Sequence, residues 1–194
     1  MTIQQPTESI YKEKGSKFIS FAIPLSSEAE IRTHLEELKT KYYDARHHCY
    51  AWIHGLSDQK WRANDDGEPS HSAGDPILGQ IRSHELTNVL VVVVRYFGGT
   101  KLGVGGLINA YKLAASQALE KAKKVILIER VRLTIAFDYD QMSTVERLIS
   151  EFEMIAERVY EERCLVRAQL AKADLSRFME MTQEMYNIKI EIES

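Results

Sequence analysis

The sequence predicts an α+β protein built from two domains. Apolar residues that alternate with polar ones, as in half-buried strands, recur along the chain between segments with helical periodicity. The last third reads as strand, helix, strand, strand, helix and strand. Charge also changes near residue 130: 17 Lys and Arg face 15 Asp and Glu up to Arg130 (net +2), and 8 face 13 from Val131 onward (net −5). We therefore expect domains over residues 1–130 and 131–194.

The first expected elements are a strand, a helix and a second strand. Residues 17–23 alternate as a strand, and the sequence from Ser27 to Glu30 has the pattern of a capping box that opens a helix. That helix has an apolar face: Ile31, Leu35, Leu38 and Tyr42. The second strand, His47–His54, leads into Gly55–Gly74, about twenty residues without evident regular structure, which in a compact domain are either functional or disordered.

The rest of the first domain is expected to pack around a central strand. Asp75 should cap a short helix with Pro76 at its first position, a favoured place for proline. Asn88–Phe97 is apolar on both faces, which predicts a strand covered on two sides. A glycine-rich segment and a helix with small packing residues follow, and then a strand over Val125–Glu129. The inward residues of the two helices are Ile77, Leu78, Ile81 and Leu107, Tyr111, Ala114, Ala115, Ala118, Ala122.

The second domain has a more regular pattern. Val131–Phe137 alternates as a strand, and Asp140 and Asp174 are expected to cap its two helices. Between those helices lie strands over Ile155–Tyr160 and Cys164–Leu170, joined by a polar turn at residues 161–163. The helix faces and last strand comprise Met142, Val145, Leu148, Ile149, Phe152; Leu175, Phe178, Met179, Thr182, Met185; and Ile188, Ile190, Ile192. The order βαββαβ is that of a ferredoxin-like domain.

Composition excludes several classes of protein. An apolar content of 44% and a charged content of 27% are those of a globular protein. The longest aliphatic run, Val89–Val94, is shorter than the roughly 18 residues of a membrane helix, and no signal-peptide core is evident, so we expect a cytoplasmic protein without a membrane partner. Cys49 and Cys164 stand apart, which argues against a disulfide framework and a zinc site. A net charge of −3 is unlike that of a strongly basic nucleic-acid binder, so any RNA contact must use a local patch.

The glycine-rich segment RYFGGTKLGVGGLINAYK, from Arg95 to Lys112, is the first candidate site. Glycine lets a backbone approach a ligand closely, and a helix start offers free amide groups to an anion. The spacing matches neither a Walker loop nor a dinucleotide fingerprint. The alternative is a tight strand-to-helix corner. The candidate anion-binding residues are Arg95, Tyr96, Gly98, Gly99, Lys101, Gly103, Gly105 and Gly106.

An acidic segment is the second candidate site. Asp65, Asp66, Glu68 and His71 lie within seven residues, and such groups can hold Mg²⁺ or act as acid and base. The alternative is a set of turns, since Asp-Gly and Glu-Pro favour turns and Asp bonds its own backbone there. The residues lack the spacing of a ligand set, and no metal or cofactor is predicted.

Other polar and aromatic residues allow two interpretations each. On a strand, His47 and Cys49 face one way and could form a nucleophilic pair, although a packed cysteine is the more ordinary role. Four aromatic residues could stack on bases or belong to the core: Trp52, Trp61, Tyr96 and Tyr111.

Two stretches of the chain resemble the signature of the IMPACT/YigZ family. They are DDGEPSHSAGDPIL and NVLVVVVRYFGGTKLGVGGLINAY, with AWIHG upstream and GSKF near the start. The resemblance implies a ribosomal protein S5 domain 2-like fold for residues 1–130. It also implies that the second domain is similar to the last domain of elongation factor G, in agreement with the βαββαβ order. Two departures occur: His71-Ser72 replaces the usual Gly-Thr, and Asn109 replaces an arginine, which removes one cation from the glycine-rich face.

The family resemblance implies a role in translation, because eukaryotic relatives act as translational regulators through a partner that activates a stress kinase. We expect a non-enzymatic protein that contacts RNA, the ribosome or a translation-related protein through the Arg95–Tyr111 face, without DNA specificity or catalytic residues. One alternative is an enzyme or sensor of a small phosphorylated ligand, with Mg²⁺ near Asp65, Asp66 and Glu68. Another is a protein-interaction module with an exposed apolar patch near the glycines. The oligomeric state stays open.

Overall fold

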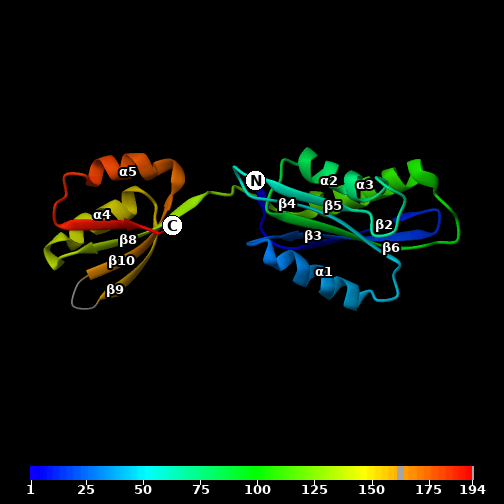
Figure 1. Cartoon of the computed structure of the whole chain (residues 1–194), viewed down its shortest axis with the longest axis horizontal. Coiled ribbons are helices and arrows are strands. Elements are labelled where there is room, and N and C mark those ends of the chain that lie inside the picture. The colour runs from blue at the N-terminus through cyan, green and yellow to red at the C-terminus, as the bar shows by residue number, and fades with distance from the viewer. Residues whose placement is uncertain (161–163, 194) are drawn as a thin grey trace. The chain divides into compact units, whose positions relative to one another are not determined.

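The chain folds as two compact units, Met1–Leu127 and Ile128–Ser194, in a computed structural model that describes residues 1–160 and 164–193 (Figure 1). Each unit combines helices with its own antiparallel sheet, so the predicted α+β class is confirmed. In the described residues, no helix combines the length and apolar character needed to cross a membrane.

The first unit is built on a five-stranded sheet in the order β2-β3-β6-β4-β5, and every neighbouring pair is antiparallel. The strands are β2 (Thr7–Glu13), β3 (Ser16–Pro24), β4 (His47–His54), β5 (Lys60–Asn64) and β6 (Val89–Tyr96). Strand β6 is central, as its two-sided apolar pattern predicts, and its residues from Val89 to Val94 are fully buried. Strands β2 and β5 were not predicted, because these edge strands are mostly polar.

Helices cover both faces of this sheet, which lies between them in Figure 1. Helices α2 (Gly74–Ser83) and α3 (Gly103–Lys121) pack on one face, where the predicted alanines of α3 are buried. Helix α1 (Ala29–Lys41) packs on the other face and places Ile31 and Leu38 against β3 and β6. The sheet is therefore the middle layer of three, and the segments between its strands and helices carry the candidate sites.

The two ends of the first unit meet in a two-stranded sheet. Strand β1 (Thr2–Ile3) pairs with β7 (Lys124–Val125) in antiparallel register. The predicted strand over Val125–Glu129 is wrong beyond Val125, since Ile126 and Ile128 are exposed and belong to no strand.

The second unit has the predicted βαββαβ order. Its strands are β8 (Arg130–Phe137), β9 (Ile155–Tyr160), β10 (Cys164–Ala171) and β11 (Ile188–Ile192), in the antiparallel order β11-β8-β10-β9. Helices α4 (Met142–Glu151) and α5 (Leu175–Thr182) share one core with the sheet, although Met179 and Ile192 are exposed, contrary to prediction. The 3-10 turns Tyr139–Gln141 and Lys172–Asp174 precede the helices. The turn predicted at 161–163 lies outside the described residues.

The predicted side-chain caps of the helices are wrong. Helix α1 has no side-chain cap bond, and its Glu30 carboxylate instead accepts a hydrogen bond of 2.9 Å from the Ser26 amide. Asp140 accepts a bond from the Gln141 side chain, and Asp174 stands at the start of α5 without capping it. Asp75 lies inside the first turn of α2, where its carboxylate bonds the His71 ring. The amides at the start of α2 instead donate to Asp65, which lies nine residues before Gly74.

Candidate functional site

The acidic segment, residues 65–71, begins with a carboxylate that caps α2. Asp65 Oδ1 accepts hydrogen bonds from the amides of Ala73 at 2.9 Å and Gly74 at 2.8 Å, and Oδ2 accepts one from the His71 amide at 2.9 Å. Burial by itself raises the pKa of Asp65, but the bonds from Gly74, His71 and Ala73 together outweigh it, so the pKa is lowered. The charge of Asp65 therefore stabilises the helix start.

Asp66 anchors the acidic segment to the start of β4. Its Oδ2 accepts a 2.6 Å bond from the His48 amide, and its carbonyl oxygen lies 2.9 Å from His47 Nδ1. Asp66 and Gly67 both have positive φ, 41° and 85°, so the backbone turns sharply here. The turn directs the next carboxylate, Glu68, toward the interior.

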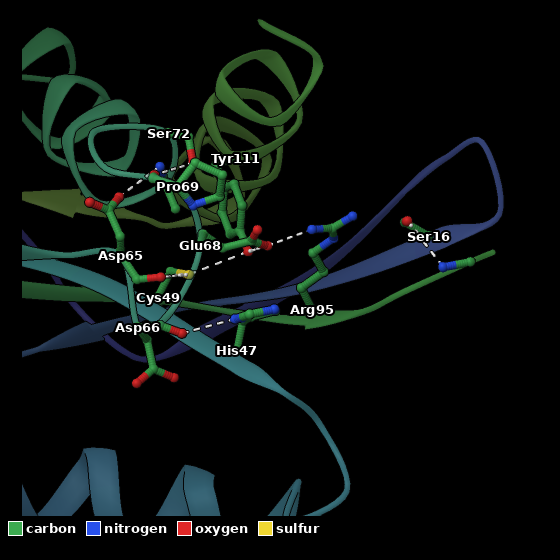
Figure 2. A network of polar contacts seen from close by, with 12 residues as sticks. Ser16, His47, Cys49, Asp65, Asp66, Glu68, Pro69, Ser72, Arg95 and Tyr111 are labelled. Atoms are coloured by element: carbon green, nitrogen blue, oxygen red, sulfur yellow. Dashed lines mark hydrogen bonds and ion pairs between the residues drawn. The ribbon is translucent and has the colours of Figure 1, made fainter. Parts of the chain in front are cut away.

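Glu68 joins three parts of the first unit (Figure 2). Its Oε1 accepts a 2.6 Å bond from Arg95 Nη1 on β6 and a 2.7 Å bond from the Tyr111 hydroxyl on α3. The exposed fractions of the Glu68 and Arg95 side chains are only 4% and 7%. The acidic and glycine-rich motifs therefore meet in space, and they meet in a buried ion pair.

Cys49 extends the same network from β4. Its thiol lies 3.0 Å from the Asp65 carbonyl oxygen and 3.3 Å from the Tyr111 hydroxyl (Figure 2). Burial raises the pKa of the Cys49 thiol and of the Tyr111 hydroxyl, which keeps both groups protonated. His47 bonds Asp66 rather than Cys49, so the structure does not form the nucleophilic pair that the sequence allows.

The carboxylates of the acidic segment are engaged in internal hydrogen bonds. Its three carboxylates each accept bonds from different internal donors, as described above. Residues 1–160 and 164–193 contain no group of three or more His, Cys, Asp and Glu side chains placed to hold a metal ion. The magnesium alternative therefore has no ligand set among the described residues.

Arg95 and Tyr96 differ from their expected role as surface anion contacts. Arg95 is buried, and its guanidinium carbon lies 5.5 Å from the centre of the Phe18 ring in addition to pairing with Glu68. Its charge is therefore neutralised inside the unit. Tyr96 donates a 2.7 Å bond to Asp44, and this bond raises the pKa of Tyr96 to about 12.

The glycine loop, residues 97–106, is held against the turn between β2 and β3. The Gly98 amide donates a 3.2 Å bond to Ser16 Oγ, and Gly15 has a positive φ of 80°. A Cβ built on Gly15 would lie 2.7 Å from the Gly98 carbonyl oxygen, closer than real side chains approach. Gly15 and Ser16 were missed as site residues, although the GSKF stretch of the family resemblance contains both.

The outer surface of the glycine loop is exposed and mixed in character. Gly98, Gly99, Lys101, Gly103 and Gly105 all face solvent, and Gly106 is half-buried. Helix α3 starts at Gly103 without a side-chain cap or an acidic residue in its first turn. Large apolar side chains are exposed beside it, with exposed fractions of 55% for Phe97, 53% for Val104 and 39% for Ile108.

The four aromatic candidates for base stacking lie in four different environments. Tyr111 is fully buried, and Tyr96 is tied to Asp44. Trp61 is 54% exposed, with the Arg82 guanidinium 4.8 Å from its ring centre. Trp52 is half-buried on the α1 side of the sheet, away from the Glu68 network.

Comparisons with known proteins agree with this description. The Impact N-terminal domain family matches residues 14–119. The IMPACT family member YvyE of Bacillus subtilis is 31% identical, over 98% of this chain and 88% of its own length. The IMPACT family member YigZ of Escherichia coli is 32% identical, over 89% of this chain and 86% of its own length. A crystal structure described as that of a hypothetical protein is 27% identical and has a TM-score of 0.72, covering 100% of this chain and 95% of that one.

Proposed function

The chain belongs to the IMPACT family, and we propose that it is a non-enzymatic protein of translational regulation. It contacts RNA, for example the RNA of the ribosome, through its glycine loop. The translational role follows the family resemblance of the acidic and glycine-rich motifs. The RNA contact rests on the surface of the loop itself.

The uncapped start of α3 is the observation that carries the RNA contact. The first amide groups of a helix have no partner within the helix, and the helix dipole makes them attractive to phosphate. Here the first turn holds exposed Gly103 and Gly105, which have no side chains, and it lacks acidic residues. The longest helix of the described chain therefore presents a bare, positively polarised end.

Neighbouring side chains add charge and a ring to this surface. Lys101 precedes the helix, and Lys14 lies on the turn that packs against Gly98; both are exposed. Phe97 exposes a ring on which a base can stack. Arg95 contributes no free charge, and the exposed Asn109 is neutral, so few cations are available. We therefore expect weak binding with a logarithmic salt slope of roughly −2.

The buried network supports this function by position rather than by chemistry. Glu68 fixes β6 to α3 through Arg95 and Tyr111, on either side of the glycine loop. The loop is thereby held at both ends and presents its backbone in one conformation, which lowers the entropy cost of binding. This arrangement accounts for the buried residues of the motif by their role in holding the loop.

A protein contact at the same loop is the second candidate. Phe97, Val104 and Ile108 are exposed close together in the sequence, and exposed apolar groups of this kind mark protein-binding surfaces. The two candidates differ in their response to salt, since apolar contacts do not weaken as the salt concentration rises.

Ribosome co-sedimentation at stepped salt concentrations tests the proposal. Lys101→Glu should reduce the pelleted fraction several-fold at low salt, while Lys123→Glu, the same charge change beyond the other end of α3, should leave it unchanged. Binding to a labelled single-stranded RNA should show the same order. Equal pelleting of wild type and Lys101→Glu would refute the RNA contact. Binding that resists salt and is lost in Phe97→Ala would favour the protein contact.

A further inference from the structure

We propose that the first unit binds an acidic amphipathic helix of a partner protein in a groove beside α1. The two faces of its sheet are covered unequally: α2 and α3 pack on one face, and α1 alone packs on the other (Figure 1). Five strands spaced about 4.8 Å apart make a sheet roughly 20 Å wide, whereas one helix is about 10 Å across. Helix α1 therefore leaves part of its face uncovered.

A groove occupies the uncovered part, toward the β4–β5 edge. Its volume is about 430 Å³. Tyr50 and Trp52 of β4 form its floor, and Ile31 and Leu35 of α1 form an apolar wall. Leu35, Tyr50 and Trp52 are only partly buried, so apolar surface remains for a partner to cover.

The shape of the groove fits a helix. Glu28, the N-cap residue of α1, and the α1 residues that line the groove recur at helical spacing as far as Lys39, a span of about 16 Å at 1.5 Å per residue. A second helix of about three turns, lying beside α1 at the usual 8–10 Å between axes, would fill this length. The face would then be covered by two helices, as the opposite face already is.

The charges along the groove favour an acidic partner. Glu28 is bonded to Lys60 at 2.8 Å, and Glu36 to Arg32 at 2.7 Å, so both carboxylates already have cations. The side chain of Arg62, which stands across from Trp52 on β5, forms no hydrogen bond or ion pair with the side chains of residues 1–160 and 164–193. The Lys39 ammonium lies 3.9 Å from the Asp66 carboxylate, at the outer limit of an ion pair. Acidic side chains flanking the apolar face of a helix would pair with Arg62 and Lys39.

The groove is independent of the glycine loop. It lies on the α1 face of the sheet, whereas α3, which begins at the loop, packs on the opposite face. An RNA strand fits the groove less well, because only two cations are available and two glutamates line the rim. The partner helix is therefore a second contact, beyond the function proposed above.

The fluorescence of Trp52 provides a local test. The chain has two tryptophans, so Trp61→Phe leaves Trp52 as the only one. Two synthetic amphipathic peptides, each about four helical turns long, would share one leucine stripe and carry either glutamates or lysines beside it. The glutamate peptide should shift Trp52 emission to the blue in a saturable manner and bind about tenfold more tightly than the lysine peptide.

Charge reversal makes the test specific. Arg62→Glu should abolish or invert the preference for the glutamate peptide, whereas Lys123→Glu, outside the groove, should preserve it. Circular dichroism and urea unfolding would verify that each variant is folded. Lys101→Glu should leave peptide binding intact, so that failure at the glycine loop is distinguishable from failure at the groove.

Three results would overturn the proposal. The first is an unchanged Trp52 emission with both peptides up to roughly millimolar concentration. The second is equal affinity for the glutamate and lysine peptides. The third is binding of a different molecule in the groove. This would be seen if an RNA oligonucleotide shifted Trp52 emission while the peptides did not, or if the full chain self-associated and Leu35→Glu abolished that association.

Discussion

Gly98 lies so close to Gly15 that a Cβ carbon on Gly98 would stand 1.8 Å from the Gly15 carbonyl carbon. The neighbouring amide of Ser16 would be 2.1 Å away. The atoms that would clash belong to the backbone, which cannot move aside as a flexible side chain can. The turn between β2 and β3 therefore packs directly against the glycine loop, and Gly15 and Gly98 must both be glycine.

Gly98→Ala should destabilise the first unit. Insertion of one methyl group into this contact forces the two backbones apart, at a cost of about 1–3 kcal/mol or more in the free energy of unfolding. Urea unfolding measures this change. The matched control is Gly79→Ala, at an exposed helical position with nothing within 4 Å of its Cβ, which should instead stabilise the protein by about 0.5–1 kcal/mol. Equal effects of the two variants would contradict the packing described here.

Glu68→Ala should be among the most destabilising changes in the chain. It leaves the buried Arg95 charge without its 2.6 Å partner, and such losses cost about 3–5 kcal/mol. Adding Arg95→Met removes the orphaned charge and should recover part of the loss, so the two changes should not be additive in urea unfolding. Arg32→Ala breaks an ion pair whose side chains are 87% and 63% exposed and should cost about 0.5 kcal/mol at most. Additive losses at Glu68 and Arg95 would argue against a coupled pair.

Asp65→Ala and Asp75→Ala should differ although both residues are close to the start of α2. Asp65 accepts three amide bonds, so its loss should cost about 2 kcal/mol, whereas Asp75 has one exposed bond to His71 and should cost little. The pKa of Asp65 is lowered, so its stabilising effect is present above its unfolded pKa near 4 and is lost as the pH falls through the folded value. Urea unfolding at pH 7 and pH 3 should show a larger difference between Asp65→Ala and wild type at pH 7.

His48→Gln should reduce the loss of stability in mild acid. Burial lowers the pKa of His48, against the opposing effect of Asp66 at 3.9 Å and with a smaller contribution from Lys39. A lowered pKa means that the folded state binds the proton less readily, so His48 favours folding above about pH 6.5, its unfolded value, and this effect is lost as the pH falls.

Unfolding between pH 7 and pH 5 would be compared in a His71→Gln background. His71 is exposed, and its bond to Asp75 raises its pKa, which gives the opposite pH dependence. His84 also has a pKa lowered by burial and is present in both proteins. A pH dependence that His48→Gln leaves unaltered would exclude His48 as the responsible group.

Local patterns in the sequence predicted most elements but few of the contacts between them. The two-sided apolar run of Val89–Val94 predicted the central strand, and the alanines of α3 predicted its close packing. Helix caps were predicted from adjacent residues, yet α2 is capped by Asp65, eight residues before its first bonded amide. Strand β2 alternates weakly because its outer face is polar. The spacing of neighbouring residues in the sequence therefore predicts neither a cap from a distant residue nor an edge strand with a polar face.

The candidate site shows the same limit. Arg95 follows the apolar run Val89–Val94 and was predicted to be a free cation, but its partner Glu68 lies 27 residues earlier, in a segment without periodicity. Tyr111, the other partner, lies 43 residues after Glu68. The family resemblance indicated that the acidic and glycine-rich segments are both parts of the site. Only the folded chain shows that residues of the two segments bond to one another.

The pairing of β1 with β7 has a consequence for the order of events during synthesis. Thr2 and Ile3 are made long before their partners Lys124 and Val125, which are among the last residues of the first unit to be made. Ile3 is 2% exposed in the folded unit, and its pairing with Lys124 cannot form before β7 has been made. During synthesis β1 therefore stays without its partner strand until β7 has been made. The pairing of β1 with β7 can then form while the second unit is being synthesised.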